Sequence, residues 1–229
     1  MTHSNPPLRP DPLAWVAGSD APEKRVVNLG FMALTDAASL IVAATQGFAQ
    51  PYGLTLNLQR QTSWSNVRDK LIEGELDAAH GLYGLIYAVH LGIGGSAAVD
   101  MAVLMGLAQN GQSISLSSTL KDAGVTDSEA LRSCVRQSGA KLTLAQTFPT
   151  GTHALWLYYW LAANGIHPLE DVRTLVVPPS QMVAHLQAGR IDGFCAGEPW
   201  GAQAIRENTG FTLATSQSIW PDHPEKVLG

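Results

Sequence analysis

The chain has 229 residues, of which 45% are hydrophobic and 14% are charged, and its formal net charge is -5. That composition is typical of a folded globular protein and excludes an intrinsically disordered chain. Because the sequence has neither a long run of lysine and arginine nor a stretch of roughly 18 apolar residues, we expect no direct nucleic-acid binding and no membrane insertion.

The N-terminal sequence MTHSNPPLRPDPLAWVAGSD is rich in proline and lacks the apolar segment of a secretory signal peptide. We therefore expect residues 1–22 to form a flexible tail. The same feature predicts a cytoplasmic protein, or a periplasmic protein if a leader has been removed.

The residues after the tail predict two successive β-α-β-α-β units. In the first unit, strands are expected over residues 26–31 and 54–61 and at the sequence LDAAHG. In the second unit, strands are expected over residues 141–147 and 174–177 and at the sequence IDGFCAG. The short connections between these elements favour parallel strands, as in α/β folds.

The two units resemble each other, because four pairs of residues recur at one constant spacing. These pairs are Ser65 and Ser180, Leu71 and Leu186, Gly74 and Gly189, and Asp77 and Asp192. The serines predict helix N-caps, as do Thr35 and Thr152 in the preceding helices. The glycines predict left-handed helix ends, and Gly47 and Gly165 do so for the preceding helices. The aspartates predict a shared structural role in the turn.

The repeat predicts an α/β protein with two similar lobes and a ligand cleft between them. Lobe one is expected over residues 23–108, with residues 216–229 returning to it, and lobe two over residues 109–215. Residues 102–118 would make the first crossing between the lobes, and FTLATSQSIW the second. Ligands of open α/β sheets bind beyond the carboxyl ends of the strands. The candidates at those ends are Thr35, Asp36, Trp64, Ser65, Thr152, His153, Pro179 and Ser180.

Two groups have chemistry suited to an anion, His153 and Gln112. His153 would be the first residue of its helix, where a neutral, donating imidazole is favoured over a cation. Gln112, at the first crossing, carries an amide that can donate without adding charge. Trp64 is either a core residue or a wall of the pocket. Asp36 lies at a helix start, where an acidic side chain is common because it stabilises the helix N-terminus. Lys226 is expected to be an exposed base unless the returning chain places it over the cleft.

Other features of the sequence give little support for catalysis or for metal binding. The sequence has no G-x-S-x-G, H-E-x-x-H or P-loop motif, so we do not expect an enzyme. His80 and the paired aspartates are expected to be structural. Cys134 and Cys195 form no C-x-x-C motif and predict small buried side chains rather than a metal site.

Five stretches of the chain resemble a known protein family. They are TSWSNVRDKLIEGELDAAH, NGQSIS, TFPTGTHALWLYYWLAANGI, GEPW and HPEKVLG. They are similar to the nitrate- and bicarbonate-binding proteins of ABC transporters, a family that also includes sulfonate and taurine binders. The resemblance implies a type II periplasmic-binding-protein fold and no cofactor or metal for nitrate. It implies that Trp64, Gln112, His153 and Lys226 hold the anion. Further candidates for the pocket, from their places in the predicted fold, are Thr35, His80, Thr152 and Pro179.

The resemblance implies a role in nitrate assimilation. Because no leader segment is seen, the chain resembles the cytoplasmic branch of nitrate/nitrite sensors, which control an RNA-binding antiterminator protein. The alternative is the substrate-binding component of a nitrate, bicarbonate or sulfonate ABC transporter, with its permease as the partner. Members of the family are longer, so we expect the C-terminal part of lobe one to be truncated here.

Two readings from other functional classes remain open at this point. One is an enzyme on the same fold, related to the synthases of a pyrimidine precursor. The other is an interaction module without a small ligand.

Overall fold

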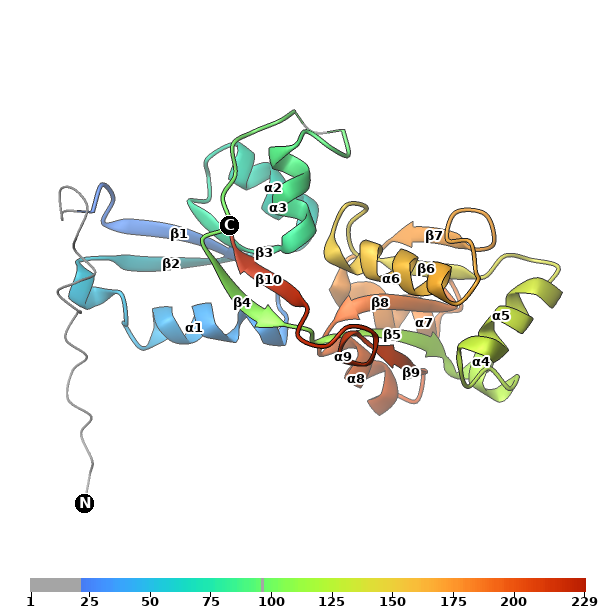
Figure 1. Cartoon of the computed structure of the whole chain (residues 1–229). Coiled ribbons are helices and arrows are strands. Elements are labelled where there is room, and N and C mark those ends of the chain that lie inside the picture. The colour runs from blue at the N-terminus through green and yellow to red at the C-terminus, as the bar shows by residue number, and fades with distance from the viewer. Residues whose placement is uncertain (1–21, 96) are drawn as a thin grey trace, which may run out of the picture.

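The protein contains two five-stranded β-sheets, each at the centre of its own α/β lobe (Figure 1). The structure is a computed structural model that describes residues 22–95 and 97–229. The predicted tail over residues 1–22 lies outside the described residues, apart from Pro22. The two lobes lie side by side and are joined by two adjacent crossings of the chain.

The sheet of lobe one has four strands that run in one direction and one strand that runs in the opposite direction. Strand β1 runs parallel to β2 and β3, whereas β10 runs antiparallel to β3 and β4. The order across this sheet is β2 (Thr55–Arg60), β1 (Val26–Phe31), β3 (Ala78–Leu82), β10 (Pro224–Leu228) and β4 (Met105–Gln109). The predicted parallel strands are therefore confirmed. The first crossing adds β4 in the same direction, and the second crossing adds β10 in the opposite direction.

The sheet of lobe two repeats this arrangement. Strand β6 runs parallel to β7 and β8, and β5 runs antiparallel to β8 and β9. The order is β7 (Arg173–Val176), β6 (Thr143–Gln146), β8 (Gly193–Gly197), β5 (Gln112–Ser117) and β9 (Gly210–Thr215). The first crossing joins β4, the fifth strand of the first sheet, to β5, the fourth strand of the second sheet. The second crossing joins β9, the fifth strand of the second sheet, to β10, the fourth strand of the first.

The paired aspartates show that the repeat is structural. The Oδ2 atom of Asp77 accepts a hydrogen bond from the backbone N of Asn28 at 2.8 Å. The Oδ2 atom of Asp192 accepts from the backbone N of Thr143 at 2.7 Å. In each lobe the aspartate before the third strand thus satisfies a backbone donor of the first strand, as the shared structural role predicted.

The helices lie against the faces of the two sheets and along the crossings (Figure 1). In lobe one they are η2 (Thr35–Ala37), α1 (Ala38–Thr45), η3 (Gln50–Tyr52), α2 (Trp64–Ile72) and α3 (Tyr83–His90). In lobe two they are α4 (Ser118–Asp122), α5 (Ser128–Gln137), α6 (Thr152–Ala163), η4 (Pro179–Gln181), α7 (Met182–Gln187) and α8 (Trp200–Arg206). Helix α9 (Ser216–Ile219) lies on the second crossing.

The predicted glycine ends of four helices are confirmed. A glycine with a positive φ follows the C-cap of α1, α2, α6 and α7, at Gly47, Gly74, Gly165 and Gly189. Glycine adopts this left-handed conformation without the steric cost that other residues meet.

The predicted N-caps are wrong, because each helix begins earlier than the pattern indicated. The cap of α2 is Ser63, whose Oγ accepts from the backbone N of Asn66 at 3.1 Å, and Ser65 lies inside the helix. Ser180 lies within η4, which has no side-chain cap. Thr35 and Thr152 are the first residues of η2 and α6, behind Leu34 and Gly151 as N-caps. His153 is therefore the second residue of α6 rather than the first.

The two crossings of the chain lie against each other. The first turns through Asn110 and Gly111, both with positive φ, between β4 and β5. The backbone N of Asn110 donates to the carbonyl O of His223 on the second crossing at 2.9 Å. Its side-chain Nδ2 donates to the carbonyl O of Trp220 at 3.0 Å. The strands assign residues 112–215 to the second sheet, and the domain limits at 108/109 and 215/216 stay a prediction.

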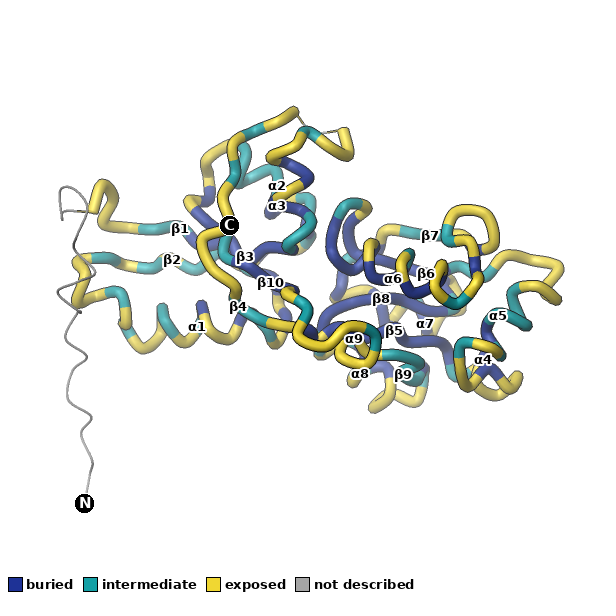
Figure 2. Tube along the Cα trace, viewed as in Figure 1, coloured by how far each residue is buried: buried dark blue, intermediate teal, exposed yellow. Residues whose placement is uncertain are grey.

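Burial is deeper in lobe two than in lobe one (Figure 2). All residues of β8 are buried, whereas β1 and β2 carry several exposed or half-buried residues. Several large apolar side chains of lobe one are exposed: Val26, Val42, Phe48, Tyr52, Leu91, Ile93, Leu104 and Met105. The truncation of lobe one stays a prediction. Among the described residues, no helix is both long and apolar enough to cross a membrane.

The tight packing of β8 predicts a stability effect at Gly193. A Cβ there would lie 2.5 Å from Cδ2 of Leu116 and 2.7 Å from the carbonyl O of Ser115. We expect Gly193→Ala to lower the free energy of unfolding by about 1–3 kcal/mol, measured by urea denaturation.

The matched control is Gly106→Ala on edge strand β4, where a Cβ meets no atom within 4 Å. It should leave stability unchanged or raise it by about 0.4–1 kcal/mol. Equal effects of the two substitutions would contradict the packing around Gly193.

Candidate functional site

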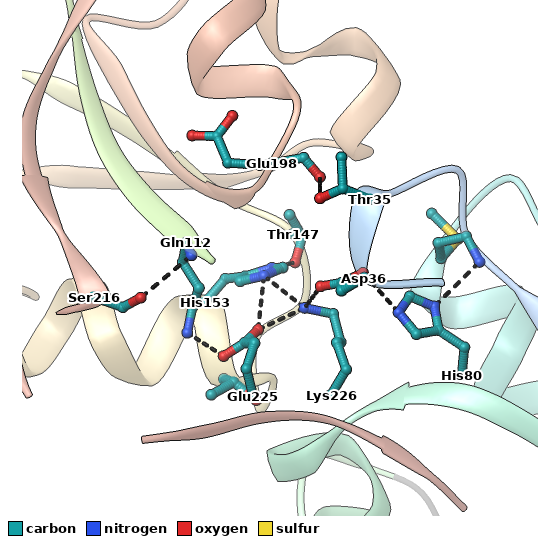
Figure 3. Close-up of polar contacts among 12 residues, drawn as sticks. Thr35, Asp36, His80, Gln112, Thr147, His153, Glu198, Ser216, Glu225 and Lys226 are labelled. Carbon is teal, nitrogen blue, oxygen red and sulfur yellow. Dashed lines mark hydrogen bonds and ion pairs between the residues drawn. The ribbon is translucent and has the colours of Figure 1, made fainter. Parts of the chain in front are cut away.

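A cluster of buried polar side chains lies where the two lobes meet (Figure 3). Lobe two contributes Gln112 from β5 and His153 from α6. Lobe one contributes Asp36 from η2 and the consecutive residues Glu225 and Lys226 from β10. Glu225, Lys226 and His153 are completely buried, and Gln112 is 3% exposed. These five side chains form the interlobe cluster, which lies at the carboxyl ends of β1, β3 and β8.

The carboxylate of Glu225 is the centre of this cluster. Its Oε1 lies 2.6 Å from Nζ of Lys226 and 3.1 Å from Nε2 of His153. Its Oε2 accepts a hydrogen bond from Nε2 of Gln112. Three donors from three different elements therefore converge on one planar carboxylate, as the dashed lines of Figure 3 show.

Lys226 is held between two carboxylates. Besides its contact with Glu225, its Nζ lies 3.0 Å from Oδ2 of Asp36. The Nζ also lies 5.8 Å from the centre of the Trp64 ring, within the range of a cation–π contact. Lys226 is thus fully buried and paired, which corrects its default reading as an exposed base.

An irregularity in β10 places both Glu225 and Lys226 in the cluster. Consecutive side chains of a regular strand point to opposite faces of the sheet. The register of β10 against β4 shifts on either side of Lys226. Such a bulge changes the direction of one side chain, so that Glu225 and Lys226 both point into the cluster although they are neighbours in sequence.

The charges of the cluster support one another. Burial acts against the charge on Lys226, but the carboxylates of Glu225 and Asp36 outweigh it and raise the lysine pKa. Burial also acts against ionisation of Glu225, but Lys226 and His153 outweigh it and lower the pKa of that carboxyl. The pKa of Asp36 is likewise lowered, against the cost of burial, by Lys226 and His80. All three groups are therefore charged at neutral pH.

The two histidines of this region are neutral. Burial and the charge of Lys226 lower the pKa of His153, against the opposing effect of Glu225. Oγ1 of Thr147 lies 2.6 Å from Nδ1 of His153, so the hydroxyl donates to Nδ1 while Nε2 donates to Glu225. His80 is also buried, and burial lowers its pKa although Asp36 opposes this.

His80 and Asp36 extend the cluster into lobe one. Nε2 of His80 lies 2.8 Å from Oδ1 of Asp36, and Nδ1 of His80 accepts from the backbone N of Met32 at 3.4 Å. Asp36 is therefore not a helix cap, as its position in the sequence suggested, but a partner of Lys226 and His80.

Trp64 is both a core residue and a wall of the cluster. It is 1% exposed and belongs to the apolar core of lobe one. Its ring centre lies 6.5 Å from that of His153 and 5.7 Å from that of His80. Its Nε1 is buried and has no hydrogen-bond partner among the described residues. An unpaired buried N–H is costly unless a further acceptor binds it.

The other predicted pocket residues have different positions. Thr35 joins the lobes, since both its backbone N and its Oγ1 lie 3.1 Å from the carbonyl O of Glu198. Oγ1 of Thr152 accepts from the backbone N of Gly84 across the lobes at 3.4 Å. Pro179 is buried within η4, and no contact described for the cluster involves it.

The sequence interpretation missed Glu225 and Thr147 and misread Asp36. No pattern in the sequence indicated Glu225, and strand alternation alone would place it opposite Lys226; the bulge in β10 brings both into the cluster. The repeat did contain a signal for Asp36. Thr35 and Thr152 are equivalent in the two units, so Asp36, which follows the first, is equivalent to His153, which follows the second. Of the cysteines, Cys195 is buried and Cys134 is half-buried, and both are free.

Residues 20–229 of this chain match the model of the NMT1-like family. The chain belongs to that family. The match extends over both lobes and includes every residue of the interlobe cluster.

Two proteins with similar sequences have names that refer to nitrate. The nitrate/nitrite binding protein NrtA of Synechocystis sp. is 41% identical over 224 residues, which cover 93% of this chain and 49% of that protein. The nitrate import ATP-binding protein NrtC of the same organism is 42% identical over 218 residues, which cover 94% of this chain and 32% of that protein. This chain therefore spans between about a third and a half of the length of these relatives.

A solved structure confirms the fold. The periplasmic nitrate-binding protein NrtA from Synechocystis PCC 6803 superposes with a TM-score of 0.85 at 40% sequence identity. The superposition covers 91% of this chain and 56% of that chain. The two lobes form the type II periplasmic-binding-protein fold, and the predicted resemblance to nitrate-binding substrate-binding proteins is confirmed.

The pairing of Asp36 predicts a stability change that depends on pH. Asp36→Asn removes one partner of the buried Lys226 ammonium and should lower the free energy of unfolding by about 1–3 kcal/mol at pH 7. Because the folded state lowers the pKa of Asp36, its contribution is present above the ordinary aspartate pKa of 3.8 and is lost as the pH falls below it. Urea denaturation at several pH values measures the difference.

The control for this prediction is Asp122→Asn at the exposed end of α4. It should change stability by less than about 0.5 kcal/mol at any pH. A constant deficit of Asp36→Asn from pH 7 down to strongly acid conditions would contradict the ionised pairing.

Proposed function

We propose that this chain binds a small monovalent inorganic anion, nitrate or nitrite, between its two lobes. One observation carries the proposal: donors of Gln112, His153 and Lys226 converge on a single planar carboxylate, that of Glu225. A carboxylate and a nitrate or nitrite ion share a planar O–X–O group with one negative charge. The donors that bind a carboxylate therefore have the geometry and the charge to bind nitrate or nitrite.

Each donor has a distinct part in this proposal. Lys226 supplies the positive charge, and its burial strengthens the attraction because the local dielectric is low. Neutral His153 and Gln112 supply directional hydrogen bonds without further charge. Trp64 forms a wall of the site, and its Nε1, which has no partner among the described residues, is a candidate fourth donor. The names of the relatives NrtA and NrtC point to the same ligands.

Ligand binding would stabilise the closed arrangement of the lobes. Gln112 and His153 belong to lobe two, whereas Lys226 and Trp64 belong to lobe one, so an anion that contacts all four bridges the lobes. The contacts of Thr35 with Glu198 and of Thr152 with Gly84 are formed across the same cleft. Two-lobed binders respond to ligand by such a shift between open and closed states.

For the role in the cell, we propose a cytoplasmic nitrate/nitrite sensor that controls an RNA-binding antiterminator of nitrate assimilation. A partner that prefers the open lobes would be released when the anion closes them. In neither role, as a sensor or in transport, would this chain itself catalyse a reaction.

The alternative is the substrate-binding component of a nitrate, bicarbonate or sulfonate ABC transporter. The name of the periplasmic relative NrtA favours it. Cell fractionation separates the two roles. Protein found only in the periplasm would exclude the sensor, and protein in the cytosol that co-purifies with an antiterminator only without nitrate would exclude the transporter component.

The binding proposal predicts the effect of removing two donors. We expect isothermal titration calorimetry to detect nitrate and nitrite binding to the wild-type chain. His153→Ala and Lys226→Met should each raise Kd by about 10- to 150-fold, because each removes a buried hydrogen bond to an anion.

The control is His90→Ala at the exposed end of α3, which should leave Kd unchanged. Heat from neither nitrate nor nitrite would contradict the proposal. If only bicarbonate or only a sulfonate bound, the chain would instead be assigned as the binding component of a transporter for that anion.

A further inference from the structure

Glu225 occupies the point on which the anion donors converge. Its two carboxylate oxygens accept from Gln112, His153 and Lys226, the three donors to which the proposed function assigns the anion. Each of these side chains is buried, and Nε2 of neutral His153 carries a single N–H, which it donates to Glu225. An anion that binds all three donors therefore displaces Glu225 from His153.

The charge balance of the cluster makes this exchange unfavourable unless a proton is added. The groups that face Glu225 are Lys226 beside it on β10, Asp36 on η2, His80 on β3, His153 on α6 and Cys195 on β8. The histidines are neutral, and burial followed by the charge of Glu225 raises the pKa of the Cys195 thiol, which stays protonated. Two carboxylates and one ammonium leave one net negative charge. A further anion would double it in a buried site.

We propose that the anion is bound together with one proton, which the carboxylate of Glu225 takes up as the anion displaces it from Gln112, His153 and Lys226. This inference rests on the proposed function of the site. One proton leaves the solvent, and one O–H bond forms on Glu225. The net charge of the cluster is the same before and after binding, because the anion replaces the charge that Glu225 gives up.

Glu225 is the group whose surroundings change most in this exchange. Lys226 and His153 are the partners that lower its pKa against the cost of burial, and displacement removes both. Asp36 keeps its contacts with Lys226 and His80. His153 keeps Thr147 at Nδ1 and exchanges one anionic acceptor at Nε2 for another. A protonated Glu225 also gains an O–H that can donate to the anion beside it.

The inference makes anion affinity depend on pH with a defined sign. Uptake of one proton on binding means that affinity falls as the pH rises. Kd should increase about tenfold per pH unit wherever Glu225 is ionised before binding and protonated in the complex. A site that relied on Lys226 alone would keep the same Kd over this range, because the pKa of Lys226 is raised above its ordinary value.

Calorimetry with nitrate from pH 6 to pH 8.5, in two cationic buffers of different ionisation enthalpy, measures both Kd and the protons taken up. We expect one proton per nitrate and the tenfold dependence for the wild-type chain. Glu225→Gln carries an uncharged side chain of the same size. It should take up no proton, vary less than about twofold in Kd over the range, and bind more tightly than wild type at pH 8.5.

Glu73→Gln, an exposed position at the end of α2, is the matched control and should behave as wild type. Infrared difference spectra of the wild-type chain give a second measurement that needs no variant. A protonated-carboxyl C=O band should appear when nitrate is added.

The outcomes separate this inference from the proposed function. Nitrate binding with constant Kd, no proton uptake and no protonated-carboxyl band would overturn the inference and leave the proposed function in place. Proton uptake that persists in Glu225→Gln would also overturn it, because another group would then carry the proton. Failure to bind nitrate or nitrite at every pH would overturn both.

Discussion

The buried ammonium of Lys226 is the charge on which the interlobe region depends. An isolated ammonium in an apolar interior is strongly unfavourable, so it is tolerated only where anionic partners surround it. Asp36 and Glu225 are these partners, and each connects Lys226 to a different part of the molecule. Asp36 connects it to η2 and His80 in lobe one. Glu225 connects it to Gln112 and His153 in lobe two, so the relative position of the lobes and the geometry of the donors are set together.

The chain path explains how such a cluster forms from residues far apart in sequence. Strand β10 enters lobe one from the second crossing and becomes the fourth strand of its sheet, between β3 and β4. This position places residues 225 and 226 at the edge that faces lobe two. The bulge at Lys226 then directs two consecutive side chains into one space. The same return strand thus completes a sheet and supplies both the cation and the central carboxylate of the site.

The cluster also shows how fold and function are connected in this family. The type II periplasmic-binding-protein fold supports many ligands, so the fold alone assigns none. Our proposal of a small planar anion rests on the donors and on the carboxylate that they bind in the structure. That this group is itself a carboxylate gives the site a second property, since a ligand must compete with a charge of its own sign. Protonation is the simplest way to relieve that competition.

The sequence by itself determined the repeat, its parallel strands and its glycine helix ends. These features follow from local rules: period-2 and helical patterning, and the left-handed conformation that glycine adopts at Gly47, Gly74, Gly165 and Gly189. The resemblance added four candidate ligands, and the structure brings Trp64, Gln112, His153 and Lys226 together. The caps could not be predicted reliably, because Thr35 and Thr152 use their hydroxyls across the lobes instead.

Only the tertiary structure decided which charges share the site. Asp36 looked like a capping acid and Lys226 like an exposed base, because local sequence carries no information about a strand that returns from the other end of the chain. The place of Glu225 in the cluster could not be predicted from local sequence either. Strand alternation places it opposite Lys226, and the bulge that reverses this arises from pairing with β4, more than a hundred residues away in sequence. Burial and long-range pairing, rather than residue type, made these three groups one ionised cluster.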